Sequence, residues 1–309
     1  MTKIKFSLFL WVLLPLLNVY GENTKKQLED AHESLSKVIN STVNSIDQFF
    51  NDSRFNEGDS TKNRTQVRFG AKTEQGGNSS LIASVRIQAS FPNLSEKFQL
   101  LIDGSSDELL VEEEKVVGAS LQDQIDFVGA AIRYNIYENE EIKINFDTGS
   151  KFTIEPKFYS LLRFRNQYKL TDDIIFRPTQ TLFYDETESG WGELTRLDLD
   201  WIVNNNKLLR SRSEARYTEV SNGFEINQEF RLRHKISEEK GVGARLNLLA
   251  ETDPSVVMTE YRTGLFYRQR LNWDWLNIET EPFLRFPRDQ DYDSVAGILL
   301  FFEIVFEKT

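Results

Sequence analysis

The chain has 309 residues, with 48 acidic and 37 basic side chains, two histidines and no cysteine. A net charge of −11 argues against a nucleic-acid partner, which needs a basic surface, and the missing cysteines exclude disulfides and thiolate metal sites. Hydrophobic residues make up only 39% of the chain but aromatic residues 12%, a composition that suits a β-barrel with a polar inside and an apolar outside. We expect no metal site and no cofactor.

Residues 1–21 have the pattern of a targeting segment. Lys3 and Lys5 precede the apolar stretch Phe6–Leu17, and the small residue Gly21 follows. This order predicts a secretory signal peptide. The apolar stretch is shorter than the about 20 residues that a membrane-spanning helix needs; an N-terminal anchor is the alternative.

The segment 22–63 differs from the rest because its apolar residues recur at helical spacing. These residues are Leu28, Leu35, Val38, Ile39, Thr42, Val43, Ile46, Phe49 and Phe50. We expect an amphipathic α-helix over Thr24–Phe50 and then a polar linker, both in the periplasm. The apolar stripe either packs on the main domain or on a copy of itself, or it binds a periplasmic partner or plugs a pore. Residues 24–52 are the contact region for a partner or for self-association.

From Arg64 onwards the period of the pattern changes to two, which is typical of strands with one apolar face. In Gly223–Ile236, for example, Phe230 and Leu232 alternate with Arg231 and Arg233. We predict about fourteen strands, at roughly 64–73, 80–91, 95–103, 123–137, 141–147, 151–168, 173–185, 191–203, 207–219, 223–236, 241–252, 256–272, 275–286 and 293–306. Hairpin turns are expected at Asp147–Ser150, Asn204–Asn206 and Ser221–Gly223.

Strand length favours a membrane protein. Most of these runs have about 10–15 residues, whereas globular strands have about 5–6 and a tilted membrane-spanning strand about 9–11. Aromatic residues also gather near strand ends, as in the girdles of membrane barrels; among them are Trp191, Tyr217, Trp273, Trp275 and Tyr292. We therefore predict an all-β fold, an antiparallel up-and-down transmembrane β-barrel over residues 64–309, with twelve strands as an alternative count. A soluble secreted β-sandwich or barrel is the competing interpretation.

The chain ends on an apolar strand, AGILLFFEIVFEKT, in which Phe302, Ile304 and Phe306 share one face. This ending resembles that of Gram-negative outer-membrane β-barrel proteins, whose last strand commonly ends in an aromatic residue with apolar residues at alternate positions. Here Glu307, Lys308 and Thr309 follow the aromatic residue, which is normally last. The resemblance implies insertion into the outer membrane, contact with outer-membrane lipid and recognition by the barrel assembly machinery.

The strand face opposite the apolar one carries many charges, and we expect it to line the lumen. The candidate lumen-lining residues are Arg210, Arg212, Arg216, Glu225, Glu229, Arg231, Arg233, Arg245, Arg262, Arg268, Glu279, Glu281 and Glu303. Arginine forms bidentate bonds with carboxylates, so these residues either pair with one another or, where arginine is in excess, select anionic solutes.

Three functions follow from this pattern. The first is a passive channel or a structural barrel with a lumen lined by arginine and glutamate. The second is interaction or assembly through the N-terminal helix. The third, an outer-membrane lipid-modifying enzyme, is the weakest because His234 is the only histidine in the barrel region and shares the face of Phe230 and Leu232. We therefore name no catalytic residues and rank an enzyme below a non-enzyme.

Overall fold

The computed structural model describes residues 42–50, 63–90, 97–105, 129–151, 155–187, 190–221, 223–273 and 275–308. Ile39–Thr309 form one compact unit. Among the described residues, no helix is both long enough and apolar enough to cross a lipid bilayer.

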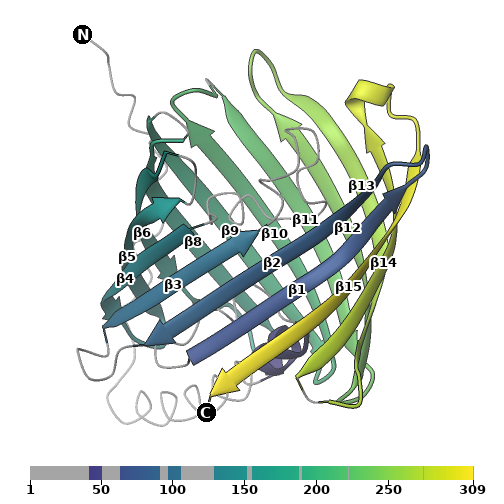
Figure 1. Cartoon of the computed structure of the whole chain (residues 1–309), viewed down its shortest axis with the longest axis horizontal. Coiled ribbons are helices and arrows are strands. Elements are labelled where there is room, and N and C mark those ends of the chain that lie inside the picture. The colour runs from purple at the N-terminus through teal and green to yellow at the C-terminus, as the bar shows by residue number, and fades with distance from the viewer. Residues whose placement is uncertain are drawn as a thin grey trace. The chain divides into compact units, whose positions relative to one another are not determined.

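Most of the described chain is β-strand (Figure 1). The first seven strands are β1 (Asn63–Glu74), β2 (Ser79–Ser90), β3 (Phe98–Ser105), β4 (Gly129–Glu138), β5 (Ile142–Lys151), β6 (Lys157–Asn166) and β7 (Tyr168–Lys169). The others are β8 (Ile174–Asp185), β9 (Gly190–Asn204), β10 (Lys207–Thr218), β11 (Phe224–Lys235), β12 (Lys240–Glu251), β13 (Val257–Arg270), β14 (Leu276–Pro287) and β15 (Val295–Lys308). A 3-10 turn, η3 (Arg288–Gln290), precedes β15.

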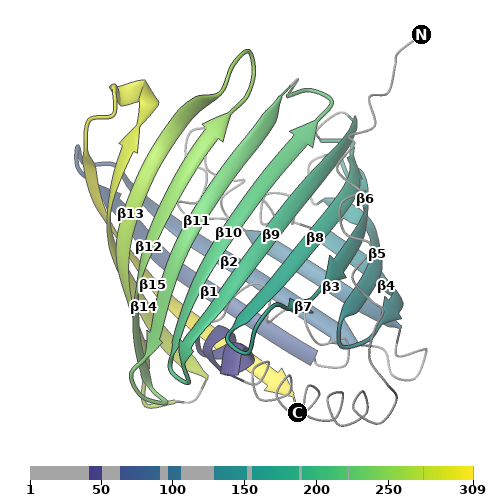
Figure 2. The same cartoon turned by 180° about the vertical axis from the view of Figure 1, so that it is seen from behind.

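The strands close into a ring because the last strand returns to the first. β15 pairs antiparallel with β1, with Asn63 opposite Lys308, and β6 pairs with β8, with Tyr159 opposite Asp185. The two-residue β7 pairs only with the edge of β8 and stands outside the ring. The described residues thus form a closed antiparallel barrel of fourteen strands (Figures 1 and 2), which confirms the predicted fold class.

One predicted hairpin is wrong. The turn expected at Asp147–Ser150 lies inside β5, which continues to Lys151. Gly149 is there for close packing and not for a turn, because a Cβ atom on it would lie 2.2 Å from the backbone oxygen of Ala130 and 2.5 Å from the hydroxyl of Tyr159. The turn expected at Asn204–Asn206 is confirmed, since it connects β9 directly to β10.

Each strand divides its residues between two environments. On β10, Arg210, Arg212 and Glu214 are buried, whereas the alternating Leu209 and Ser211 are half-exposed. Because the sheet is closed, the buried face is the one that points into the ring, and a shift of one residue would invert every side chain. Large apolar side chains are exposed on the outer face, among them Phe230, Leu232, Leu246, Leu265 and Leu284.

The inside is not uniformly polar. We call the end at which β1 begins and β15 ends the terminal end, and the opposite end the far end. Two apolar clusters occupy the half of the interior nearer the far end. One contains Ala131, Tyr159, Leu161, Phe183 and Leu194, and the other contains Ile82, Phe283, Leu299 and Phe301. These residues share the parity of the charged face, so the sequence pattern did not reveal them.

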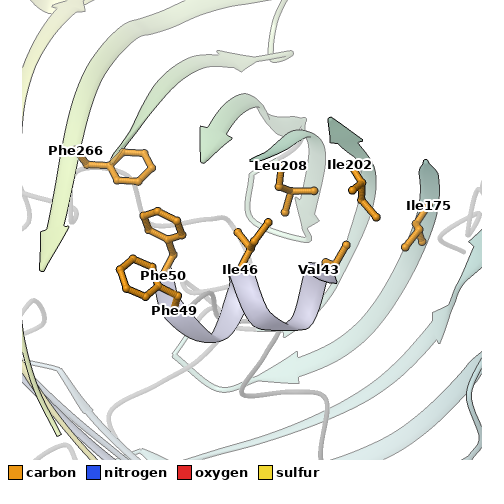
Figure 3. Close-up of a cluster of buried hydrophobic side chains, with 8 residues drawn as sticks. All are labelled: Val43, Ile46, Phe49, Phe50, Ile175, Ile202, Leu208 and Phe266. Atoms are coloured by element: carbon orange, nitrogen blue, oxygen red, sulfur yellow. The ribbon is translucent and has the colours of Figure 1, made fainter. Parts of the chain in front are cut away.

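A helix over residues 42–50 lies inside the barrel at the terminal end (Figures 1 and 3). Its buried apolar side chains are Val43, Ile46, Phe49 and Phe50, and they pack against Ile175, Ile202, Leu208 and Phe266 of the barrel wall. Asn44, Ser45 and Gln48 are exposed. The expected amphipathic helix is therefore present over these nine positions; its predicted part before residue 42 lies outside the described residues.

Candidate functional site: the charged barrel interior

The interior contains almost as many acidic as basic side chains. Among the buried charged residues of the described chain, twelve are basic and ten are acidic. Removing a charge from water is costly unless it is paired, so this near balance indicates a network of ion pairs. All the candidate lumen-lining residues of the sequence lie on six neighbouring strands, β10 to β15.

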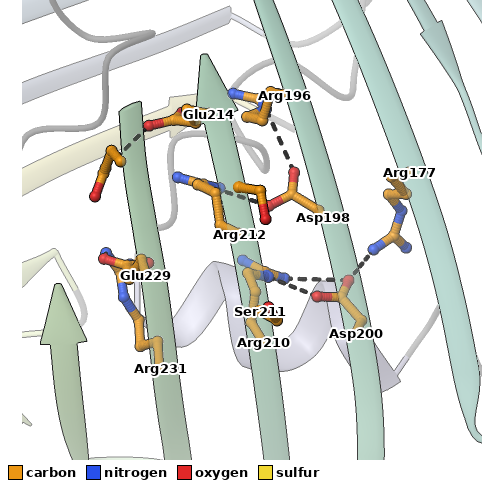
Figure 4. Close-up of polar contacts among 12 residues, drawn as sticks. Arg177, Arg196, Asp198, Asp200, Arg210, Ser211, Arg212, Glu214, Glu229 and Arg231 are labelled. Atoms are coloured by element: carbon orange, nitrogen blue, oxygen red, sulfur yellow. Dashed lines mark hydrogen bonds and ion pairs between the residues drawn. The ribbon is translucent and has the colours of Figure 1, made fainter. Parts of the chain in front are cut away.

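A ladder of alternating charges joins β9 to β10 (Figure 4). In the antiparallel register Arg210 stands opposite Asp200 and Arg212 opposite Asp198. The Nε atom of Arg210 lies 2.6 Å from Oδ1 of Asp200, and that of Arg212 lies 2.8 Å from Oδ1 of Asp198. Arg177 of β8 also bonds Asp200. Each aspartate is therefore held by arginines, and the ladder is neutralised locally.

The next pairs connect β10, β11 and β12. Arg216 Nη1 lies 3.2 Å from Oε2 of Glu225. Glu229 has two arginine partners. Its Oε2 atom lies 2.5 Å from Nη2 of Arg231 and 4.0 Å from Nε of Arg245. Charges therefore pair along a strand as well as between strands, because the register places Arg231 opposite Arg210 and Arg245.

Further along the wall, pairs skip a strand. Arg268 on β13 bonds Glu303 on β15 at 2.9 Å and Glu279 on β14 at 3.2 Å. Glu281 accepts from Arg245 at 3.2 Å and from Arg262 at 3.4 Å. All the candidate residues from the sequence except Arg233 therefore take part in the pairs described so far.

The sequence pattern missed Asp47, which lies on the helix of residues 42–50. Its Oδ1 atom is 2.6 Å from Nη1 of Arg233, and its Oδ2 atom is 2.9 Å from Nη2 of Arg210. Asp47 is only 4% exposed. The available signal was its spacing, four residues after Val43 and three before Phe50, which puts it on the same face of a helix as part of the apolar stripe.

Two further pairs lie outside the candidate set, one on the opposite wall and one where the ring closes. Arg133 on β4 makes a bidentate bond with Asp147 on β5, with both contacts at 2.7 Å. Asp147 escaped notice because the sequence assigned it to a turn. Arg285 on β14 reaches Glu74 on β1 at 2.8 and 3.0 Å.

Water-accessible space remains inside the ring beside β1, β2 and β3. The side chain of Arg68 is 31% exposed although it points inward, onto the ring of Phe301 at 4.1 Å and to Glu279 at 3.3 Å. The side chain of Arg86, paired with Asp103 at 2.7 Å, is 35% exposed. A small polar pocket lies among β3, β4, β5 and β6, and Gln99, Arg133, Asn145 and Arg165 are among its lining residues.

Among the described residues, no histidine side chain points into the ring. His234 lies on β11 between Lys207 of β10 and Val242 of β12, on the face that points away from the ring. Within the described ranges, no group of three or more histidine or acidic side chains is arranged to hold a metal ion.

Fold and site together define a class, an up-and-down antiparallel β-barrel with an apolar outer surface and a paired, charged interior. No protein-family model matches the chain, and no curated protein sequence matches it. The solved structures similar to it include outer-membrane OmpT of Vibrio cholerae, with 8% identity over 79% of this chain and 97% of that chain and a TM-score of 0.48. The outer-membrane channel DcaP of Acinetobacter baumannii matches with 7% identity over 79% and 96% and a TM-score of 0.43. A KdgM porin matches with 8% identity over 78% and 99% and a TM-score of 0.39.

Proposed function

We propose that the protein spans the outer membrane and acts as a narrow passive pore for small polar solutes. The outer surface supports a location in lipid, because apolar side chains at mid-strand are exposed, with Leu265 at 64%. Burying such a band in a bilayer removes it from water, whereas a soluble protein rarely exposes so large an apolar surface. An even number of strands brings both ends of the ring to one side, which we assign to the periplasm.

Aromatic pairs at the two ends of the barrel support the same location. At the terminal end, Trp273 stacks on Trp275 with ring centroids 5.5 Å apart. At the far end, Tyr184 meets Trp191 at 5.3 Å and Tyr261 meets Tyr292 at 5.7 Å. Amphipathic rings favour the boundary between lipid and water, so the two sets would sit at the two membrane interfaces.

The single observation that carries the pore is the exposure of Arg68 and Arg86 inside a closed ring. Inward charges that stay accessible to water require a hydrated lumen. The small basic excess among the buried charges, twelve against ten, would give that lumen a weak preference for anions, because most arginines are neutralised by their partners.

Planar-bilayer recording of the refolded protein tests this proposal. We expect small discrete current steps with a reversal potential shifted weakly toward anions, and Arg68→Glu should shift it toward cations. Phe69→Leu is the matched control, since Phe69 is the outward neighbour of Arg68 on β1 and should leave selectivity unchanged. Silence of the wild type and of every variant would favour a purely structural barrel.

Interaction through residues 24–52 stays a prediction. The described part of this segment packs its apolar side chains on the inner wall of the barrel. Asn44, Ser45 and Gln48 are therefore left facing away from the wall. A pull-down with the full chain, compared with a variant that alters only these three positions, would test whether a periplasmic partner binds there.

A further inference from the structure

The helix of residues 42–50 fills a socket on the inner wall at the terminal end of the barrel. We infer that this helix is a removable plug, latched by Asp47, and that Arg210 and Arg233 form a carboxylate-binding site which Asp47 occupies within the same chain. The inference rests on the proposed pore, since a plug needs a passage to close.

The socket has an apolar part that fits the helix closely (Figure 3). Val43 and Ile46 are fully buried in the same cluster as Ile202 and Leu208 of β9 and β10. Phe50 meets Phe266 edge to face, with ring centroids 5.6 Å apart. These wall residues have the inward parity, so without the helix they would present apolar side chains to a hydrated lumen.

Basic side chains surround the aromatic pair of the helix. The guanidinium of Arg233 lies 5.7 Å from the ring centre of Phe50, and the ammonium of Lys235 lies 5.8 Å from that of Phe49. Cations attract the faces of aromatic rings. The socket therefore recognises a helix with two adjacent phenylalanines as well as an acidic residue.

The charged part of the socket is a clamp of two arginines from neighbouring strands. Arg210 comes from β10 and Arg233 from β11, and both bond the carboxylate of Asp47. Arg210 also keeps Asp200 as a partner, so its charge stays paired when the helix leaves. When the helix leaves, it uncovers a position for a carboxylate between the two guanidiniums. Apolar side chains border this position.

A buried carboxylate is a poor choice for a permanent seal. Replacing a buried ion pair by well-packed apolar residues is often neutral or stabilising, so apolar residues at position 47 and at both arginine positions together would hold the helix at least as firmly. An ion pair instead makes the contact sensitive to competing anions. A solute with a carboxylate and a short apolar part has the chemistry to take the place of Asp47 and free the helix.

The wall has room for the helix at Gly241, the second residue of β12, because this residue has no side chain. A Cβ atom there would lie 2.5 Å from Cε1 of Phe49 and 2.6 Å from Cζ of Phe50. Because both contacts are with rigid rings of the helix, a larger residue at 241 would push the helix out while leaving Asp47 and both arginines unchanged.

Chemical labelling tests the plug without any reference to conduction. The chain has no cysteine, so an Ile46→Cys variant carries a single thiol at a fully buried position. In lipid vesicles we expect a water-soluble maleimide to react with it slowly, and to react about tenfold faster or more when Asp47→Asn is added. Gly241→Leu should accelerate labelling to a similar extent.

Two controls accompany these variants. Asp47→Asn combined with Gln48→Asp keeps the net charge but moves the carboxylate to the exposed side of the helix, and it should label as fast as Asp47→Asn alone. Gly104→Leu, at a glycine whose Cβ would find its nearest neighbour at 3.8 Å, should label as slowly as the parent. Unchanged labelling in both Asp47→Asn and Gly241→Leu would overturn the plug.

Citrate identifies the ligand class of the site. At equal ionic strength, citrate should accelerate labelling at position 46 at least severalfold more than chloride, and this difference should disappear in an Arg233→Gln background. Equal effects of the two anions would reject a carboxylate site.

Conductance recorded on the same variants separates this inference from the proposed function. Larger or more frequent current steps in Asp47→Asn and Gly241→Leu than in the wild type support both the pore and the plug. Fast labelling without current in any variant leaves the removable helix in place and removes the pore. Current in the wild type that neither substitution changes overturns the plug and leaves the pore.

Discussion

Arg268 on β13 reaches past β14 to Glu303 on β15, with Nη2 2.9 Å from Oε1 and Nη1 3.1 Å from Oε2. Both side chains are almost completely buried. Backbone hydrogen bonds connect only adjacent strands, so this side-chain pair adds a second layer of connection between strands that are not neighbours. In the same way Arg285 of β14 reaches Glu74 of β1 across β15. The interior network therefore braces the ring where the chain closes.

Removing one partner of the Arg268–Glu303 pair should lower the free energy of unfolding. Glu303→Leu leaves the buried guanidinium of Arg268 with Glu279 alone, and we expect a loss of about 3–5 kcal/mol in the free energy of unfolding. Adding Arg268→Met should recover part of that loss, because no unpaired charge then remains. Urea titration in lipid vesicles measures both, with Ile304→Leu on the outer face as the control. Strictly additive losses would show that the two residues do not interact.

Adding a charge to the outer face of β12 should destabilise the barrel more than removing a charge from its inner face. Leu246 points outward, and Leu246→Arg should destabilise the inserted barrel by about 2–4 kcal/mol if it lies near the middle of the bilayer. Arg245→Leu should cost less, because Glu281 keeps Arg262 as a partner at 3.4 Å. The yield of folded protein in vesicles, read from heat-modifiable migration in gels, compares the two. A barrel that tolerates Leu246→Arg and not Arg245→Leu does not have this face in lipid.

Gly70 of β1 lies close against β15. A Cβ atom at this position would lie 2.1 Å from the backbone oxygen of Leu300 and 2.6 Å from Cδ1 of Phe301. Gly70→Ala should therefore strain the closure of the ring and lower the free energy of unfolding by about 1–3 kcal/mol. Gly104→Ala, which has room, should change it little. Equal stability of the two variants would mean that β1 and β15 are not held in this register.

The tryptophans of the barrel should lie at the membrane interfaces. Trp191 begins β9, Trp201 stands near its end, and Trp273 and Trp275 flank the turn before β14. Brominated lipids quench fluorescence by proximity, so lipids with bromine close to the headgroup should quench more strongly than lipids with bromine near the chain ends. The absence of quenching by either lipid would reject a membrane location and restore the soluble barrel.

The strands and their two faces were determined by the sequence alone. Phe230 and Leu232 alternate with Arg231 and Arg233 in the sequence, and in the structure they separate onto the two faces of β11. This was predictable because a period of two depends only on the local geometry of an extended chain. The count of about fourteen strands followed for the same reason, although the turn predicted at Asp147–Ser150 lies inside β5.

The contents of the barrel were decided only by the tertiary structure. Leu208 and Leu209 are adjacent apolar residues on β10, and alternation requires one of them to point inward, yet nothing local says what Leu208 would contact there. Its neighbours in the same cluster, Val43 and Ile46, come from a helix far away in the sequence. Asp47 meets Arg233 across 186 positions. Such contacts depend on how the closed ring brings distant strands and the helix together, and that arrangement leaves no periodic trace in the sequence.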